Sequence, residues 1–444
     1  MCANRNQFGL TAIVGRKPVR KQALMFASCS LWVLFLSAPA CLAQSVVALD
    51  KPSQQEERMK SCLESTCRNV PNREKLTAIN LSKRYIRGIF GGFEQGAGIA
   101  GGVQLTSADT IPAVELRTTV LTSSRFYRRF DAEAYLPNIR GSRNHADVWF
   151  GYSWRESNFF GIGPRLSEDL KTHFALEQRS YQGSLYRDLA DHLQGGVYAG
   201  FTNSHSSSGK VNGDTPIGEN FSSAPDQPAG QWIPGFLSNT KILSYGGFLV
   251  YDTRDDANGL TRGINIYTRA ASDDGLNNHA AFADYGWIEA EVDVRGYIPL
   301  GSTRTSLALR SRGQFKEPKG GSQIPFYDLS WMGGREYLRG YQSYRFRGNN
   351  MLLFSTELRR TVYSKTDTRG LDMFGFADSG QVWGDARSQA DPLILKNQNF
   401  GSSNWHSGVG GGLQYRHSGT LAARFEVGHS NEDTVIYFSM SRGF

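Results

Sequence analysis

Apolar residues recur at every second position from about residue 92 to Phe444, between short stretches of turn-forming residues. In TSLALRSRG, Leu307 and Leu309 share one face, whereas Arg310 and Arg312 lie on the other. MLLFSTELR and LAARFEV alternate in the same way. A period of two is typical of β-strands with one apolar and one polar face. The pattern therefore predicts an all-β protein.

The alternation divides this region into successive strands. We predict strands near 92–107, 111–121, 126–137, 144–156, 172–187, 193–206, 243–254, 262–272, 281–300, 304–316, 350–363, 370–384, 404–418, 420–430 and 433–444. A single-chain bacterial barrel with both ends in the periplasm needs an even number of strands. We therefore expect a short additional first strand near 84–90, which makes sixteen.

The lengths of the predicted connections support a barrel. The long connections, 157–171, 207–242, 317–349 and 385–403, all follow odd-numbered strands in the sixteen-strand count. They would therefore lie on one side, and connections of the other parity are mostly short. Long external loops and tight periplasmic turns are typical of transmembrane barrels. A soluble sandwich also alternates, but an exported chain of this length without cysteine in its strands fits a transmembrane antiparallel β-barrel better.

The N-terminus is what indicates export. Residues 1–43 hold a basic start, the apolar run ALMFASCSLWVLFL and then small residues, which is typical of a signal peptide cleaved after Ala40 or Ala43. We expect a short polar periplasmic segment over residues 44–83 and the outer-membrane barrel domain over 84–444.

Two cysteines, Cys62 and Cys67, lie in SCLESTC within the 44–83 segment. Disulfides form in exported proteins, so this pair predicts one disulfide. Two free thiols, or a weak metal spacing without a nearby His, are the alternatives.

Composition and charge narrow the class of protein further. The chain has 444 residues, of which 39% are hydrophobic and 12% aromatic, and its mean hydropathy is −0.41. A bundle of membrane helices needs repeated apolar runs of about 20 residues, and the chain has one comparable run, in the signal. Five Lys and Arg residues and no acid lie in residues 1–43, so without them the formal charge falls from +8 to +3. We therefore expect no nucleic-acid partner.

The search for enzyme motifs is mostly negative. GAGIAG, with Gly96, Gly98 and Gly101, fits a dinucleotide pattern, but no helix pattern and no acid about 20 residues later follow it. A glycine-rich membrane strand explains it better. There is no GxSxG or HExxH motif, and the eight His are scattered. We expect no catalytic residues, metal or cofactor, although a hydrolase with an unfamiliar site stays open.

Four segments in order carry a family resemblance. They are DTRDDANGLTRG, the LRGY of the 317–349 connection, FGFADSGQVWGD and GGLQYRHSGTLAARFEVGHS. Over about residues 90–444 the chain resembles the BamA/TamA-type outer-membrane assembly proteins, also called the bacterial surface antigen family. In that family the corresponding loop folds back into the barrel, and its Arg-Gly-aromatic tip meets a Phe-x-Asp on the inner wall.

Applied to this sequence, the resemblance implies an inward-folded plug loop whose tip is Arg339, Gly340 and Tyr341. Arg339 would contact Phe376 and Asp378. Physical chemistry favours the same pairing, because Asp378 must face the lumen to avoid lipid, and a guanidinium can bond a carboxylate and stack on a ring together. An exposed Arg339 that binds nothing is the alternative.

The ends of the predicted barrel suggest a function. The last strand, with Phe438 and Phe444, resembles the C-terminal recognition strand of outer-membrane barrels, although Arg442 departs from its usual aromatic. We expect a seam between this strand and the glycine-rich first strand, with Gly96, Gly98 and Gly101, because Gly weakens strand pairing.

We therefore expect an integral outer-membrane protein of a Gram-negative bacterium, monomeric, with both termini in the periplasm. It would insert or move protein or lipid through the seam. The family's periplasmic POTRA domains are larger than residues 44–83, so the resemblance is to stand-alone members. Expected partners are outer-membrane lipid and either a separate periplasmic protein or unfolded substrate chains. A plugged pore for small solutes, and a surface-exposed structural or adhesive barrel using loop 207–242, are the alternatives.

Overall fold

The computed structural model describes the barrel region of the chain. The described residues are 86–94, 98–111, 114–125, 127–209, 215–223, 231–254, 262–276, 284–301, 304–366, 369–384, 399–417 and 421–440. The predicted signal peptide, the 44–83 segment with Cys62 and Cys67, and the predicted seam residues Gly96 and Phe444 lie outside them.

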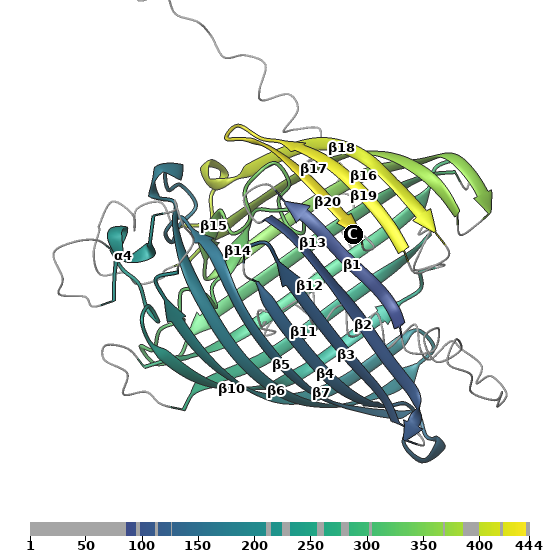
Figure 1. Cartoon of the computed structure of the whole chain (residues 1–444), viewed down its shortest axis with the longest axis horizontal. Coiled ribbons are helices and arrows are strands. Elements are labelled where there is room, and N and C mark those ends of the chain that lie inside the picture. Colours follow the sequence, from purple (N-terminus) through teal and green to yellow (C-terminus); the bar gives the residue numbers. More distant parts are fainter. Residues whose placement is uncertain are drawn as a thin grey trace, which may run out of the picture. The chain divides into compact units, whose positions relative to one another are not determined.

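Sixteen strands of the described residues form one closed antiparallel barrel in chain order, in which the last strand pairs with the first (Figure 1). They are β1 (Ile86–Glu94), β2 (Gly98–Ile111), β3 (Val114–Ser123), β4 (Arg128–Leu136), β5 (Asn144–Phe159), β6 (Thr172–Ala190), β7 (Leu193–Ser207), β10 (Asn239–Asp252), β11 (Gly263–Gly275), β12 (Gly286–Pro299), β13 (Thr305–Pro318), β16 (Asn350–Thr366), β17 (Arg369–Trp383), β18 (His406–His417), β19 (Leu421–His429) and β20 (Thr434–Met440). This confirms the predicted fold class and strand number, including the short first strand.

The connections divide the barrel into two rims. The long connections, 160–171, 208–238, 319–349 and 384–405, all leave one end, which we call the long-loop rim. The other end, the short-turn rim, has turns such as the one between β6 and β7. The predicted asymmetry of loop lengths is therefore present.

The connections contain the remaining elements. These are the short strands β8 (Phe221–Ser222), β9 (Gln231–Trp232), β14 (Ser330–Met332) and β15 (Phe346–Gly348), the helix α4 (Ile217–Asn220), and 3-10 turns at Ile139–Gly141, Glu168–Leu170 and Ser402–Asn404. Among the described residues, no helix is long and apolar enough to cross a membrane.

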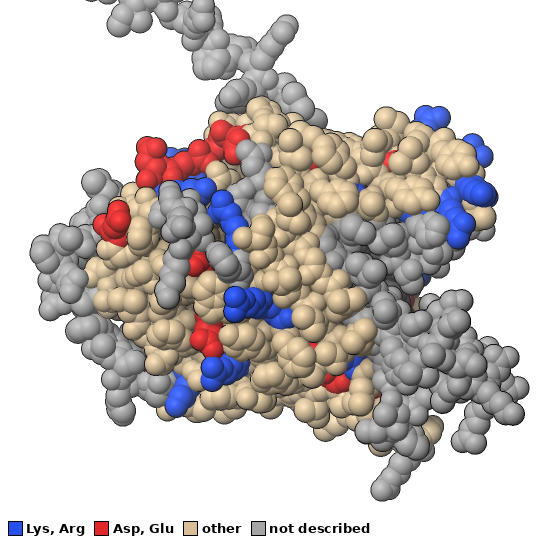
Figure 2. Space-filling view, viewed as in Figure 1, with Lys and Arg blue, Asp and Glu red and all other residues tan. Residues whose placement is uncertain are grey.

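The strands place apolar side chains outside and charged ones inside, the reverse of a soluble protein. Val148, Leu185 and Val197 are about 60% exposed, at 63%, 59% and 60%. By contrast, the inward-facing Asp293 and Arg310 are buried. Uncharged residues accordingly dominate the face in Figure 2. Alternation of this kind is what a strand between lipid and an aqueous lumen requires.

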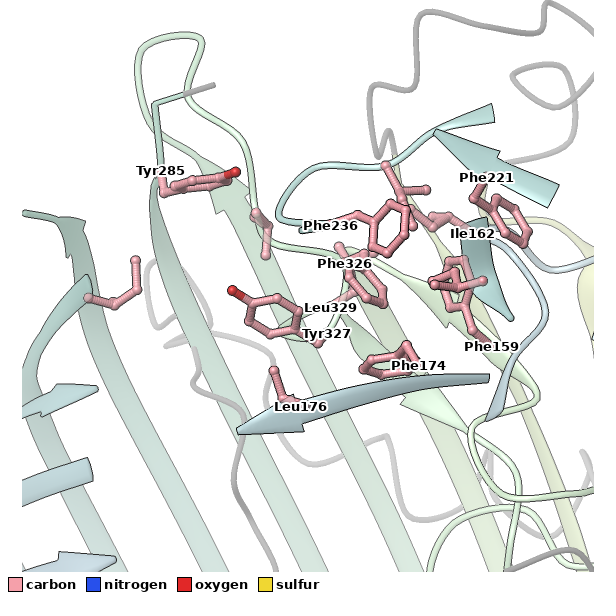
Figure 3. Packing of buried hydrophobic residues seen from close by; sticks show 14 of the residues in the cluster. Phe159, Ile162, Phe174, Leu176, Phe221, Phe236, Tyr285, Phe326, Tyr327 and Leu329 are labelled. Atoms are coloured by element: carbon pink, nitrogen blue, oxygen red, sulfur yellow. The ribbon is translucent and has the colours of Figure 1, made fainter. Parts of the chain in front are cut away.

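Three of the long connections pack together through an aromatic cluster at the long-loop rim (Figure 3). Phe159 and Phe174 come from the ends of β5 and β6, and Phe326 comes from the 319–349 connection. The ring centroid of Phe326 is 5.0 Å from that of Phe159 and 4.7 Å from that of Phe174. Phe221 and Phe236 from the 208–238 connection belong to the same cluster. The 319–349 connection is therefore held by its neighbours at this rim.

The barrel closes through a pairing between β1 and β20. Within the described residues, Gly91–Glu94 pairs with Tyr437–Met440. A Cβ added to Gly92 would lie 2.6 Å from the carbonyl oxygen of Phe438, so this pairing needs the glycine. We call the β1–β20 pairing the seam.

One prediction about the seam is wrong by one strand. Gly98 and Gly101 lie in β2, where they pair with β1 and β3 rather than with β20. The error arose because glycines recur over residues 91–102, so the sequence offers several places for the first turn. The chain turns between Glu94 and Gly98, which assigns Gly91 and Gly92 to the seam instead. Phe438 does lie at the seam, opposite Phe93.

Candidate functional site

Arg339 lies in the 319–349 connection, between β14 and β15, and contacts the inward face of β17. Its Nε and Nη2 donate to the two carboxylate oxygens of Asp378, each at 2.7 Å, and its backbone N–H donates to the same carboxylate at 3.1 Å. Both side chains are about 3% exposed. The bidentate geometry and the burial make this a strong charge-assisted pair.

The guanidinium of Arg339 also stacks on Phe376, with Cζ 3.5 Å from the ring centroid. The ring approaches β18 closely at Gly410, where an added Cβ would lie 2.5 Å from Phe376 Cζ. Glycine at this inward position of β18 therefore makes room for the ring beneath the guanidinium. The predicted residues Arg339, Phe376 and Asp378 are thus in contact in the structure.

Two more strands supply carboxylates to the same guanidinium. Arg339 Nη1 lies 2.9 Å from Glu357 Oε2 on β16 and 3.2 Å from Glu426 Oε2 on β19. Arg424 on β19 bonds both of these acids, at 2.7 Å each, and Arg359 bonds Glu357 at 2.6 Å. We call these side chains the lumenal ion cluster: Arg339, Arg359, Arg424, Glu357, Asp378 and Glu426.

The charges of the lumenal ion cluster balance, with three cations and three anions. Burial alone would lower the pKa of the Arg339 guanidinium, but Asp378, and then Glu357 and Glu426, outweigh it, so its pKa is raised. Arg339 thus stays charged. Burying such a group is tolerable only while its partners remain in place, because an unpaired buried charge is costly.

The tip backbone sits on glycines of the inner wall. Gly340 has φ +96°, a conformation that other residues rarely adopt. A Cβ on Gly408 of β18 would lie 1.9 Å from the carbonyl oxygen of Arg339, and one on Gly428 of β19 would lie 2.6 Å from Gly340 N. The inner wall therefore has no side chain at these two positions, where the backbone of the tip contacts it.

Hydrogen bonds join the tip to the last strand and the last turn. Gly340 N–H donates to the Tyr437 hydroxyl at 3.0 Å, and that hydroxyl donates to the Tyr341 carbonyl at 3.2 Å. Ser430 Oγ donates to the Gly340 carbonyl at 2.7 Å. Burial, with Glu432 nearby, raises the pKa of Tyr341 to about 12, so its hydroxyl stays a donor to Asn431.

The 319–349 connection also contacts the inward faces of β12 and β13, which neighbour β16 in the barrel. Arg310 of β13 pairs with Asp293 of β12 at 2.6 Å and donates to the carbonyl of Glu336 at 3.0 Å. Arg312 Cζ lies 4.9 Å from the ring centroid of Tyr337. Contacts with these two strands and with β16 to β20 fix the position of this connection relative to the barrel.

The lumenal ion cluster can clamp one part of the chain to another. Its groups are engaged in Arg–carboxylate pairs, which are not poised acids, bases or nucleophiles. Across the described parts of the chain, no group of three His, Cys, Asp or Glu side chains could hold a metal ion.

Sequence reasoning did not identify four members of the lumenal ion cluster as site residues: Arg359, Arg424, Glu357 and Glu426. The alternation placed Glu357 with Arg359, and Arg424 with Glu426, on the polar faces of their strands. That these faces converge on one guanidinium depends on barrel closure and curvature, which no local pattern encodes. Tyr437 was missed because its partners are backbone atoms of a distant loop.

A closed barrel with a lipid-compatible exterior and a charged interior defines an integral outer-membrane β-barrel. Within that class, residues 133–444 match the model of the Omp85 superfamily domain, and the chain belongs to this superfamily. The family finding supports the resemblance seen in the sequence. It makes the chain a Gram-negative outer-membrane β-barrel.

Solved structures show the same fold at low sequence identity. BamA from Haemophilus ducreyi lacking POTRA domains 1–3 is similar with a TM-score of 0.59 and 14% identity, over 80% of this chain and 69% of that one. CdiB from Escherichia coli is also similar, with a TM-score of 0.53 and 13% identity over 85% of this chain and 64% of that one. CdiB from Acinetobacter baumannii has a TM-score of 0.51 and 13% identity over 81% of this chain and 60% of that one. The chain spans less than two thirds of either CdiB chain. No curated protein sequence matches it.

Proposed function

We propose that this barrel inserts or translocates protein or lipid at the outer membrane by opening its seam. The observation that carries the proposal is the pairing of Gly91 and Gly92 of β1 with Met440 and Ser439 of β20. These two glycines bring no side chain to the pairing, so the cross-strand side-chain contacts that stabilise a sheet are fewer at these two positions.

In this proposal the 319–349 connection is a plug and the lumenal ion cluster is its lock. Arg339 is the one member supplied by the connection, so withdrawal of the connection removes one cation from a balanced set. The lock would keep the lumen closed to solutes while the seam is available to substrate. Support comes from the burial of Arg339 and its three carboxylate partners.

We further propose that the long-loop rim faces the outside of the cell and that both termini are periplasmic. The barrel would act as a monomer, without catalytic residues or a cofactor, on unfolded substrate chains or together with a separate periplasmic protein. The usual asymmetry of outer-membrane barrels supports this orientation.

A disulfide across the seam tests the proposal. Phe93 and Phe438 are directly opposed and both face outward, so Phe93→Cys with Phe438→Cys should oxidise readily. The assay measures how fast a urea-denatured outer-membrane barrel folds into vesicles that contain the protein. Oxidation should reduce the rate to that of protein-free vesicles, and reductant should restore it.

The matched control places the disulfide between β2 and β3. Val103 and Val120 are also opposed and outward-facing, so Val103→Cys with Val120→Cys should oxidise without changing the rate. A seam-locked protein that keeps full activity would reject the seam mechanism. The same outcome together with solute conductance in Arg339→Ala would favour the alternative, a plugged pore, which the buried lock also suits.

A further inference from the structure

The outward face of the barrel is hollowed across β3 to β7. A depression of about 690 Å³ crosses these strands. Its floor contains Ala134, Gly183 and Ala199, and Phe150, Tyr181 and Phe201 stand along one side. The volume lies within the range of sites that hold small ligands.

Strand register explains the hollow. Ala134 is opposite Val148, Val148 is opposite Gly183, and Gly183 is opposite Ala199, so three small residues and one valine form one transverse row. The next row towards the long-loop rim is Phe150, Tyr181 and Phe201, with successive ring centroids 5.1 and 6.5 Å apart.

The hollow is open at its centre. A Cβ added to Gly183 would approach only the carbonyl oxygen of Asp147 within 4 Å, at 3.9 Å. Because this part of the barrel faces lipid, an acyl chain must fill the space or leave apolar surface without contacts.

Basic side chains border the hollow on its long-loop side. Arg179 and Lys241 both lie opposite Asn203, one row above Tyr181 and Phe201, and both are exposed. Arg128 faces outward at the start of β4. Arg179 is paired with Glu177 at 2.7 Å, but at 57% exposure it remains accessible to a ligand. An apolar hollow beneath basic groups matches the shape of an anionic lipid.

A protein partner fits the hollow less well. The strands that line it are paired along both edges, so no backbone donors or acceptors are available for an added strand. A lipid chain needs none. We therefore propose that the hollow binds an acyl chain of a phosphorylated glycolipid, whose phosphate lies between Arg179 and Lys241. The choice of a glycolipid rests on the proposed orientation, in which the leaflet at the long-loop rim is the outer one.

The test measures lipid retention by the detergent-purified full chain, using native mass spectrometry with diphosphorylated lipid A, its dephosphorylated form, phosphatidylglycerol and phosphatidylcholine as probes. Wild type should retain lipid A in preference to the other three. Gly183→Leu, which fills the hollow, should weaken lipid A binding about tenfold. Arg179→Ala with Lys241→Ala should abolish the preference for phosphorylated over dephosphorylated lipid A.

Gly296→Leu is the matched control, because Gly296 also faces outward, on β12, with no atom within 4 Å of an added Cβ. It should bind lipid A as wild type does. Unchanged binding by Gly183→Leu, or equal retention of phosphatidylcholine, would overturn the site. A preference for phosphatidylglycerol would overturn the assignment to a glycolipid. Each of these results leaves the seam disulfide experiment unaffected, so the two proposals fail separately.

Discussion

Arg339 joins carboxylates from β16, β17 and β19, and removal of its guanidinium should therefore leave buried anions without a partner. We expect Arg339→Ala to destabilise the barrel by about 3–5 kcal/mol if water stays excluded, and by much less if it enters. The thermal unfolding temperature should fall and the conductance in planar bilayers should rise. Unchanged values of both would contradict the lock.

Two further variants sharpen that measurement. Arg339→Lys keeps the charge but loses the bidentate fork and the stacking on Phe376, so it should restore only part of the stability. Arg360→Ala removes an exposed cation from the same region of β16 and should change neither reading.

A variant at Gly408 tests whether the tip of the 319–349 connection lies against β18, and it removes no charge. Gly408→Ala would place a Cβ 1.9 Å from the Arg339 carbonyl oxygen, so the tip must lift from β18. We expect conductance to rise as in Arg339→Ala. Gly375→Ala is the control, since its Cβ would meet nothing closer than a carbonyl oxygen at 3.8 Å. Equal conductance in the two variants would show that the tip does not rest there.

Cys62 and Cys67 should be oxidised in the mature protein. On an α-helix five positions turn through about 500°, so the two side chains would diverge, and a disulfide requires non-helical backbone between them. Mass measurement after alkylation without reductant should find no modified thiol. Two alkylated cysteines would remove this prediction.

At the level of elements, the side on which the long connections lie indicates how the barrel is oriented across the outer membrane. Asp169 lies in the 160–171 connection and Asp191 lies in the β6–β7 turn at the opposite rim. In intact cells, a membrane-impermeant maleimide should label Asp169→Cys and spare Asp191→Cys. Lysed cells, in which both should react, provide the control. The reverse labelling would place the long-loop rim in the periplasm.

Most of these elements could be predicted, because the alternation of apolar and polar residues in a membrane strand reflects its lipid-facing and lumen-facing sides. The two faces are visible directly in Leu307, Leu309 and Arg310, and turn residues separate one strand from the next. The first hairpin could not be placed, because Gly92, Gly98 and Gly101 are equally compatible with strand and turn. Side-chain alternation has no meaning where side chains are absent.

The site was predicted less completely than the fold. The Arg339, Phe376 and Asp378 contact was anticipated from the family resemblance, with support from the need to keep a carboxylate out of lipid. Glu357 and Glu426 could not be assigned to this contact from the sequence, because they reach Arg339 only through the curvature of the strands that carry them. Convergence of this kind is a property of the closed sheet.

In the whole molecule, the plug and the seam meet at one strand. Tyr437 of β20 accepts the hydrogen bond of Gly340, and Ser439 of the same strand accepts one from Arg335 at 3.0 Å. Release of the tip therefore removes supports from the strand that would open. Coupling of the two events follows from this shared element.

Tyr437→Phe tests the coupling. Loss of the hydroxyl leaves the Gly340 N–H without its acceptor and should loosen the tip and β20 together. We expect faster amide hydrogen exchange in both β20 and the 338–341 tip. Tyr415→Phe, on the outward face of β18, should exchange as wild type does. Faster exchange in the tip alone would show that the lock and the seam are independent.

The closure of the ring at the seam also gives the barrel a mechanical direction. Under tension applied to the C-terminus, β20 carries the load along two edges, one paired with β1 and one with β19. The edge against β1 contains Gly91 and Gly92, so its bonds would break first, one after another, and the sixteen strands would be left as an open, curved sheet. A substrate strand that pulls on β20 would need to overcome only a few hydrogen bonds at a time.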